Sequence, residues 1–486
     1  MQTLPSDPQP APEPTGLTLA PFRGVRYAPD RVSGIANVTS PPYDVIGPGT
    51  VQRLLASEPH NVVRLILPGA ESGQSPLGLA AGPSERAAAT LRDWLGSGVL
   101  HRDPGPALYV YEQSWPAGRH PADTADTADT AAGADGAAGG PGWEVVQRGL
   151  IGALRLVPPA APSVLPHEDV MPGPVRGRRE LMETTQANLE PIFLLYDSAE
   201  ESGAAGAATA GGRPAGPRGP ATRLVDEVAV TRPPLLSAVT DDGIRHRLWA
   251  VTDPEEQAVI AEDLATRSAL IADGHHRYAA YLELQAGKRA AGCGAGPWDY
   301  GLAFLVDSAA YPPRIGAIHR AVPGLTPARA AEMAKGTFDV QPVSGDLDAA
   351  QRALAGAGPD DPAFLLTDGA EHYLVTSPRP DRLAAAMPAG HSARWRGLAA
   401  SVLRELLIRD AWGRRDEEPD VVVVPGDAAA AVQAAREAGG TAVITTPVAA
   451  ADVRAVAANG ERMPRKSTSF GPKPRTGLVI RTFAAP

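Results

Sequence analysis

The sequence contains one cysteine, Cys293, among 486 residues. A single thiol cannot form an intramolecular disulfide, and disulfide frameworks belong to oxidising compartments. Long apolar runs are lacking too, because none approaches the roughly 18 to 20 residues that cross a bilayer. The first residues are rich in proline and carry neither a basic nor an apolar signal region. We therefore expect a cytoplasmic protein with no membrane partner.

Basic charge is scarce, since 45 Lys and Arg residues stand against 55 Asp and Glu residues and give a formal charge of −10. Broad nucleic-acid binding needs a positive footprint, so a nucleic-acid partner is not expected. The sequence also lacks a Gly-x-x-x-x-Gly-Lys-Ser/Thr motif, which excludes a Walker P-loop. Any anion site must therefore be a local concentration of positive charge.

The order of helical and strand patterns indicates an α+β protein with more than one domain. We expect residues 1–18 to be disordered, residues 19–320 to form a first domain and residues 321–486 to form a second α+β domain. Low-complexity insertions at 117–142 and 199–220 interrupt the first domain, and the former joins two strands of its sheet. The β-branched runs at 61–68 and 225–231 predict two further strands.

Residues 269–281 read ALIADGHHRYAAY, an apolar run followed by Asp-Gly and a helical pattern. This predicts a strand-to-helix junction at which Gly274 adopts a positive φ and lets the backbone approach a ligand. The unpaired N–H groups of the first helical turn, together with His275, His276 and Arg277, favour an anion there. Phosphate is the expected anion, gripped by Arg277 through two oxygens. The alternative is an ordinary helix cap that faces water.

A metal ion held by the two histidines is less favoured. Because His275 and His276 are adjacent, their side chains diverge by about 100° on a helix and do not easily chelate one ion.

A second basic segment lies near the end of the sequence, at residues 460–477. Its five Lys and Arg residues outnumber Glu461, and its prolines restrict the backbone. We expect Lys466, Ser467 and Thr468 to fold back and form a second wall of the same phosphate site. A solvated basic loop is the alternative.

Three carboxylates are candidates for a general base or a magnesium ligand, namely Asp44 in PPYDVI, Glu168 in LPHEDV and Asp273 in the junction. The alternative for Asp44 is a turn residue or a helix cap. Glu168 follows His167 on a proline-flanked loop, which is typical of site chemistry but also of an ordinary surface loop.

The segment GHHRYAA resembles the GCHRY signature of sulfiredoxins and, more loosely, the Gly-x-x-Arg box of ParB-type CTP-binding domains and archaeal free-serine kinases. His275 stands where sulfiredoxins carry their nucleophilic cysteine, so the resemblance argues against sulfinic-acid repair. Over most of its length the sequence also resembles a widespread bacterial and archaeal family catalogued as a domain of unknown function. The segments that carry this resemblance are PPYDVI, HNVVRLILP, LPHEDVMPGP, TTQANLEPIFLLYD, IADGHHRY, AIHRAV and GERMPRKSTSFGPKPRTGLV.

The resemblance implies a ParB/sulfiredoxin-like nucleotide-binding core with insertions, followed by the C-terminal α+β domain. Its implied function is a nucleotide-dependent kinase that uses ATP or another nucleotide with Mg²⁺ and acts on a small hydroxyl-bearing metabolite such as free serine. In this reading Asp44, Glu168, His275 and His276 are catalytic. Asp273, Gly274, Arg277, Lys466, Ser467 and Thr468 bind the nucleotide, as do the two histidines. A ParB-like nucleotide-binding or hydrolysing regulator, or a scaffold with a vestigial site, is the alternative.

Overall fold

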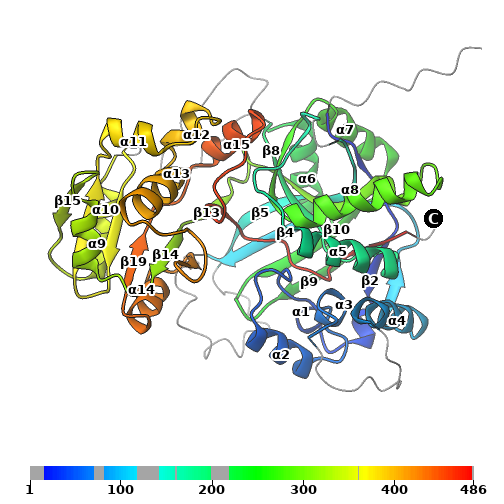
Figure 1. Ribbon diagram of the computed structural model, residues 1–486. Helices are drawn as coiled ribbons and strands as arrows, with labels where there is room; N and C mark the ends of the chain where they lie inside the picture. The colour runs from blue at the N-terminus through cyan, green and yellow to red at the C-terminus, as the bar shows by residue number, and fades with distance from the viewer. Residues whose placement is uncertain are drawn as a thin grey trace, which may run out of the picture. The chain divides into compact units, whose positions relative to one another are not determined.

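The computed structural model describes residues 16–70, 82–117, 142–158, 161–198, 218–358 and 361–483. Of the segment 1–18 that is predicted to be disordered, residues 1–15 lie outside these ranges, as does the greater part of both insertions. The chain divides into two compact units, the first made of residues 1–164, 170–312 and 473–486 and the second of residues 165–169 and 313–472. Both contain helices and sheets, so the predicted α+β class is confirmed (Figure 1).

A nine-stranded sheet forms the centre of the first unit, in the order β6, β11, β8, β12, β5, β4, β10, β9, with β1 paired to β5. Strands β8 and β12 run parallel, whereas β4, β5 and β10 form antiparallel ladders. The strands are β1 (Leu19–Ala20), β4 (Leu108–Pro116), β5 (Trp143–Arg155), β6 (Val164–Leu165), β8 (Ile192–Tyr196), β9 (Leu236–Val239), β10 (Arg245–Val251), β11 (Ala269–Asp273) and β12 (Tyr300–Asp307).

The low-complexity segment 117–142 follows β4 and precedes β5. These two strands pair with each other, and Pro116 lies opposite Trp143 at the end of the ladder. The segment therefore joins neighbouring antiparallel strands, as the sequence pattern indicated.

A four-stranded sheet in the first unit contains the last strand of the chain. Its order is β3, β2, β21, β7, so the C-terminal strand lies between two strands from the first 200 residues. The sequence predicts a second domain over residues 321–486, whereas this strand pairs with β2 and β7. The strands are β2 (Gly24–Tyr27), β3 (Leu100–Arg102), β7 (Ala187–Asn188) and β21 (Ile480–Thr482).

Helices α5 and α8 of the first unit lie side by side (Figure 1). Helix α8 buries Tyr278, Tyr281 and Leu284 against the sheet. Helices α6 and α7 also pack together. The helices of this unit are α1 (Ile35–Val38), α2 (Pro48–Ser57), α3 (Val63–Ile66), α4 (Pro83–Gly96), α5 (Pro172–Thr185), α6 (Pro220–Thr231), α7 (Pro254–Leu264) and α8 (His275–Ala290), with 3₁₀ turns at Pro29–Arg31 and Pro297–Asp299.

Two predicted strands are helices, so those predictions were wrong. Residues 63–66 form α3, whose first N–H donates to the side-chain oxygen of Asn61 at 2.9 Å. Residues 225–231 belong to α6, which buries Ala221, Val225 and Val228 at helical spacing. A short β-branched run has the same apolar character in a buried helix and in a strand, and only its packing partners decide between them.

The second unit contains a six-stranded antiparallel sheet in the order β15, β17, β16, β19, β14, β18 and a two-stranded sheet of β13 and β20. The strands are β13 (Arg314–Gly316), β14 (Ile318–Val322), β15 (Asp339–Pro342), β16 (Phe364–Thr367), β17 (His372–Thr376), β18 (Val422–Pro425), β19 (Thr441–Ile444) and β20 (Ser469–Gly471). The helices are α9 (Pro327–Ala334), α10 (Leu347–Ala355), α11 (Pro380–Ala386), α12 (Ala393–Gly397), α13 (Ala399–Ser401), the π-helix η5 (Val402–Ala411), α14 (Ala428–Glu437) and α15 (Ala450–Ala458).

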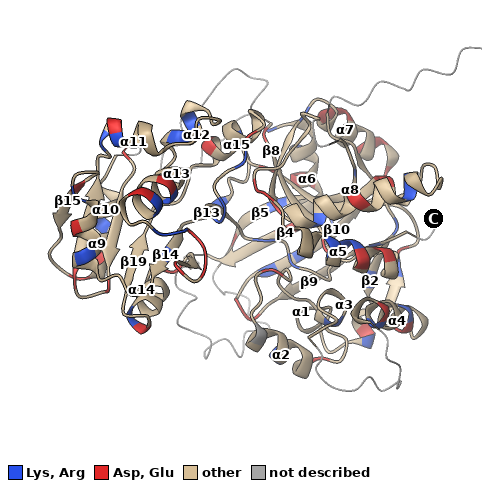
Figure 2. Ribbon diagram, viewed as in Figure 1, with Lys and Arg blue, Asp and Glu red and all other residues tan. Residues whose placement is uncertain are grey.

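Figure 2 shows Lys and Arg residues interspersed with Asp and Glu residues on the helices and loops of both units. None of the helices in the described ranges has the length and apolar character needed to cross a membrane.

Candidate functional site

The predicted strand-to-helix junction is present. Strand β11 stops at Asp273, helix α8 starts at His275, and Gly274 between them has φ 91° and ψ 29°. A Cβ atom on Gly274 would lie 3.0 Å from Cγ2 of Ile192 and 3.1 Å from Nε of Arg277. Both the positive φ and the close neighbours thus favour glycine at the N-cap.

Arg277 supports this junction from inside the protein. Its side chain is 4% exposed, Nη1 donates to the carbonyl of Pro191 at 2.5 Å, and Nη2 pairs with Oδ2 of Asp273 at 2.5 Å. Burial acts to lower the pKa of Arg277, but the carboxylates of Asp273, Glu190 and Asp44 raise it above its usual value. Both terminal nitrogens already bond to protein groups, so the geometry gives Arg277 a role in positioning Asp273.

Lys473 brings two predicted site carboxylates together. Its Nζ lies 2.5 Å from Oδ1 of Asp273 and 3.8 Å from Oδ1 of Asp44. The side chain of Asp273 is 9% exposed, whereas those of Lys473 and Asp44 are 22% and 33% exposed. Three distant segments of the sequence thus meet at the N-terminus of α8, and two of the three charges remain accessible to solvent.

The segment that carries Lys473 is fixed by backbone pairing. Ser40 and Thr476 exchange backbone hydrogen bonds of 3.2 and 2.8 Å, which aligns residues 473–477 with the loop that precedes Asp44. Gln113 also donates to the carbonyl of Lys473 at 3.1 Å. The position of the ammonium is therefore set by strands and loops on both sides.

Arg475 in the same segment is a partly buried cation. It donates to the hydroxyl and the carbonyl of Thr39, each at 3.2 Å, and burial lowers its pKa. Its backbone N–H donates to the hydroxyl of Tyr111, which also bonds to Nδ1 of His246 at 2.8 Å. The loop is thus anchored to the central sheet.

Glu190 is a buried carboxylate that contacts Tyr43, the residue before Asp44. Its Oε1 accepts from the backbone N–H of Tyr43 at 3.1 Å, and its Oε2 lies 3.7 Å from the Arg178 guanidinium. Burial raises the pKa of Glu190, although Arg277 and Arg178 oppose the shift. Burial likewise raises the pKa of Tyr43 to about 12. These groups shape the wall next to Asp44.

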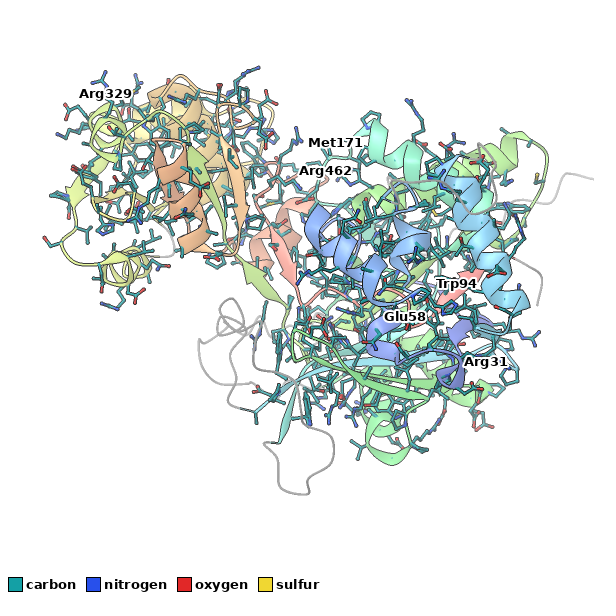
Figure 3. The ribbon with its side chains drawn as sticks, turned by 90° about the horizontal axis from the view of Figure 1, so that it is seen from below. Arg31, Glu58, Trp94, Met171, Arg329 and Arg462 are labelled. Atoms are coloured by element: carbon teal, nitrogen blue, oxygen red, sulfur yellow. The ribbon has the colours of Figure 1, made fainter. Side chains whose placement is uncertain are left out.

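His275 and His276 occupy the first turn of α8. His275 is 6% exposed, and Nε2 of His276 accepts from the backbone N–H of Met171 at 3.1 Å. Met171 is the N-cap of α5 and is labelled in Figure 3. His276 therefore links the first turns of two neighbouring helices. No group of three or more His, Cys, Asp or Glu side chains suited to a metal ion occurs within the described ranges.

The remaining predicted site residues lie in the second unit. The hydroxyl of Thr468 donates to Oε1 of Glu168 at 3.2 Å and lies 2.9 Å from Nε2 of the buried His167. The hydroxyl of Ser467 donates to the carbonyl of Pro464 at 2.7 Å. Lys466 has a positive φ of 53°. Their membership of the phosphate site stays a prediction.

Sequence reasoning missed the role of Lys473. It counted this residue among the basic charges of 460–477 but selected Lys466 as the residue that reaches the junction. Glu190 and Arg475 were also missed, although both lie in segments that carry the family resemblance. The pairing between Ser40 and Thr476 has no signal in a single sequence.

Several solved structures are similar to this chain at low identity. A free serine kinase in complex with AMP is 14% identical, with a TM-score of 0.30, over 66% of this chain and 88% of that chain. SbnI with a C-terminal truncation, from Staphylococcus aureus, is 12% identical, with a TM-score of 0.31, over 67% and 86% of the two chains. A conserved hypothetical protein from Pyrococcus furiosus is 15% identical, with a TM-score of 0.30, over 66% and 92%.

No curated protein matches the sequence significantly. A family model does match, over residues 19–123 and 139–401, and these ranges include Asp44 and the whole of the β11–α8 junction. Lys473 lies beyond the matched ranges. The chain belongs to the family described as protein of unknown function, DUF1015.

Proposed function

We propose that the protein is a nucleotide-dependent phosphotransferase that acts on a small hydroxyl-bearing metabolite such as free serine. The observation that carries the proposal is the meeting of Lys473, Asp44 and Asp273 at the N-terminus of α8. Phosphoryl transfer requires positioning and charge stabilisation more than covalent chemistry by the protein. An ammonium, two carboxylates and a helix N-terminus are suited to that task.

The phosphates of ATP or another nucleotide bind at the first turn of α8 in this proposal. The N–H groups of that turn have no partners within the helix, and the helix dipole adds positive potential there. Lys473, whose side chain is 22% exposed, exchanges a carboxylate for a phosphate oxygen as the partner of its ammonium. His275 and His276 are further candidate phosphate ligands, and Arg277 holds Asp273 and the junction in place.

Asp44 is the proposed general base, because its side chain is 33% exposed and belongs to the same cluster. It accepts the proton of the substrate hydroxyl as that oxygen bonds to the terminal phosphorus. The bond between this phosphorus and the nucleotide diphosphate breaks, and the diphosphate leaves with the electron pair. Glu168 stays a second candidate for a catalytic carboxylate.

The carboxylates at the N-terminus of α8 are compatible with binding of Mg²⁺. Protein sites for this ion usually supply one or two carboxylates, with phosphate oxygens and water completing the octahedron. Asp273 is the carboxylate that would hold it once Lys473 binds phosphate, which leaves Asp44 as the base. When bound, the ion would neutralise charge on the transferred phosphoryl group.

One observation favours the alternative, a ParB-like nucleotide-binding or hydrolysing regulator without kinase activity. Asp273 is already paired with both Arg277 and Lys473. If Asp273 stays neutralised when nucleotide binds, one accessible carboxylate remains, which suffices for binding but weakens the case for a magnesium-dependent transfer.

Mass spectrometry separates the two functions. The full chain would be incubated with ATP, Mg²⁺ and a panel of hydroxy amino acids. A phosphotransferase gives a phosphorylated amino acid in amounts equal to the nucleotide diphosphate formed. Formation of the nucleoside diphosphate without any phosphorylated amino acid would support the nucleotide-hydrolysing regulator instead.

The variant Asp44→Asn tests the proposed base and should lose transfer by about two orders of magnitude or more. Asp30→Asn is the control, because Asp30 lies on an exposed turn of the same unit with a side chain that is 80% exposed.

A further inference from the structure

The second unit contains a cavity of about 790 Å³ that the proposed function does not use. Its wall is formed by the start of β14, the last residues of α10, helices α12 and α13, the loop between β19 and α15, and Lys466 with Ser467. Cavities of roughly 300 to 1,000 Å³ are typical of small-molecule sites.

The charged groups in the wall differ in whether they have partners. Arg394 pairs with Asp452 at 2.8 Å, and Arg320 pairs with Asp416 at 2.7 Å. Asp361 accepts from the N–H and the hydroxyl of Ser377. The Lys466 ammonium forms no ion pair or hydrogen bond with any residue that the structure describes. It is therefore available to an anionic group.

The backbone at Lys466 has an unusual conformation. Its φ of 53° lies in the left-handed region, which is uncommon for residues other than glycine. The carbonyl of Lys466 accepts from Nη2 of Arg320 at 3.0 Å, and the buried Arg320 is held in turn by Asp416. Residues kept in such conformations by surrounding bonds cluster at ligand sites.

Apolar side chains form part of the wall beside these polar groups. Leu354, Leu398 and Leu403 line the cavity and are themselves 4%, 6% and 3% exposed, so they belong to firmly packed elements. A ligand that carries one anionic group on an apolar body would match both the ammonium and these leucines.

We propose that this cavity binds a small organic acid, with the carboxylate paired to Lys466 and the aliphatic body packed on the leucine wall. This site lies within the second unit and does not depend on the proposed phosphotransfer. A failure of either proposal therefore leaves the other standing.

Titration calorimetry with octanoate tests the proposal, using the full chain without nucleotide at constant ionic strength. Octanoate should bind with one-to-one stoichiometry, and 1-octanol, which has the same chain without the charge, should bind at least about tenfold more weakly. Absence of saturable octanoate binding, or equal affinity for the alcohol, overturns the assignment.

Three variants locate the site. Lys466→Met should weaken octanoate binding about tenfold or more, whereas Lys335→Met, at an exposed lysine paired with Glu332 on α9, should leave it unchanged. Ala355→Trp, at an exposed position in the wall, should fill the cavity and abolish binding even if Lys466→Met proves unstable. Wild-type affinity in Ala355→Trp, or an equal loss in Lys335→Met, contradicts the proposal.

Discussion

Replacing Lys473 by methionine gives the sharpest test of the proposed nucleotide site. The change keeps most of the apolar side chain and removes the ammonium that lies 2.5 Å from Asp273 and 3.8 Å from Asp44. An ammonium and a carboxylate 4 Å apart near a protein surface attract by about 4 kcal/mol before desolvation is subtracted. Removing Lys473 therefore leaves two carboxylates facing an incoming phosphate without their shared counter-ion.

We expect the affinity for ATP to fall by about 10- to 100-fold, which corresponds to about 1.5 to 3 kcal/mol for one charge-assisted contact. The free energy of unfolding should change by only about 1 kcal/mol, because the ammonium is partly exposed to solvent. Titration calorimetry with ATP and Mg²⁺, at fixed ionic strength, measures the first quantity, and urea unfolding measures the second.

Lys288→Met is the matched control for this experiment. The Lys288 side chain is also 22% exposed and also ion-paired, at 3.6 Å to Glu183, but it lies in the last turn of α8. Equal ATP affinity in wild type and Lys473→Met would refute the phosphate-binding role. An equal loss in both variants would show that overall charge, and not the site, governs binding.

Three further predictions concern the scaffold of the site. Arg277→Gln should destabilise the fold by about 3 to 5 kcal/mol in urea unfolding, because it breaks a buried ion pair; a change below 1 kcal/mol would contradict its positioning role. Gly274→Ala should cost about 1 to 3 kcal/mol through its positive φ, and an unchanged unfolding midpoint would argue against that backbone geometry. Burial and the nearby Arg475 lower the pKa of His246 to about 3 from 6.5, so the folded state keeps this ring neutral while the unfolded chain takes up a proton. Its contribution to stability is therefore present above pH 6.5 and lost as the pH falls towards 3, at about 1.4 kcal/mol per pH unit. His246→Gln should remove this slope and His101→Gln, at a ring that is 40% exposed, should not; equal slopes in wild type and His246→Gln would contradict the assignment.

The β11–α8 junction was predictable because its determinants are local. An apolar run, an Asp-Gly pair and a helical pattern follow one another within residues 269–281, and each has a direct backbone consequence. The positive φ of Gly274 follows from the same local pattern.

The pairing of Lys473 with this junction was not predictable, because it depends on contacts between distant residues. Thr39 and Arg475, which anchor the Lys473 loop, are 436 residues apart in the sequence. Composition identified the basic segment 460–477 correctly as a concentration of charge. It could not tell which lysine the pairing of Ser40 with Thr476 would bring to Asp273.

The two strands that proved to be helices illustrate a different limit. In α3, the side chain of Asn61 bonds both the first helical N–H and the backbone of residues 37 and 39. Such a link between a side chain and a distant loop overrides the β-preference of Val62 and Val63. Intrinsic β-preference decides the structure of a segment only where its packing contacts favour neither helix nor strand. Val62 and Val63 are fully buried, so their packing contacts decide instead.

The position of β21 has a consequence for synthesis on the ribosome. This strand pairs with β2 and β7, and the segment before it supplies Lys473. A nascent chain that has emerged only as far as residue 472 already contains both carboxylates and helix α8, yet lacks the ammonium and a central strand of the four-stranded sheet. The first unit is thus finished last, and the proposed nucleotide site is complete only in chains whose translation has passed the entire second unit.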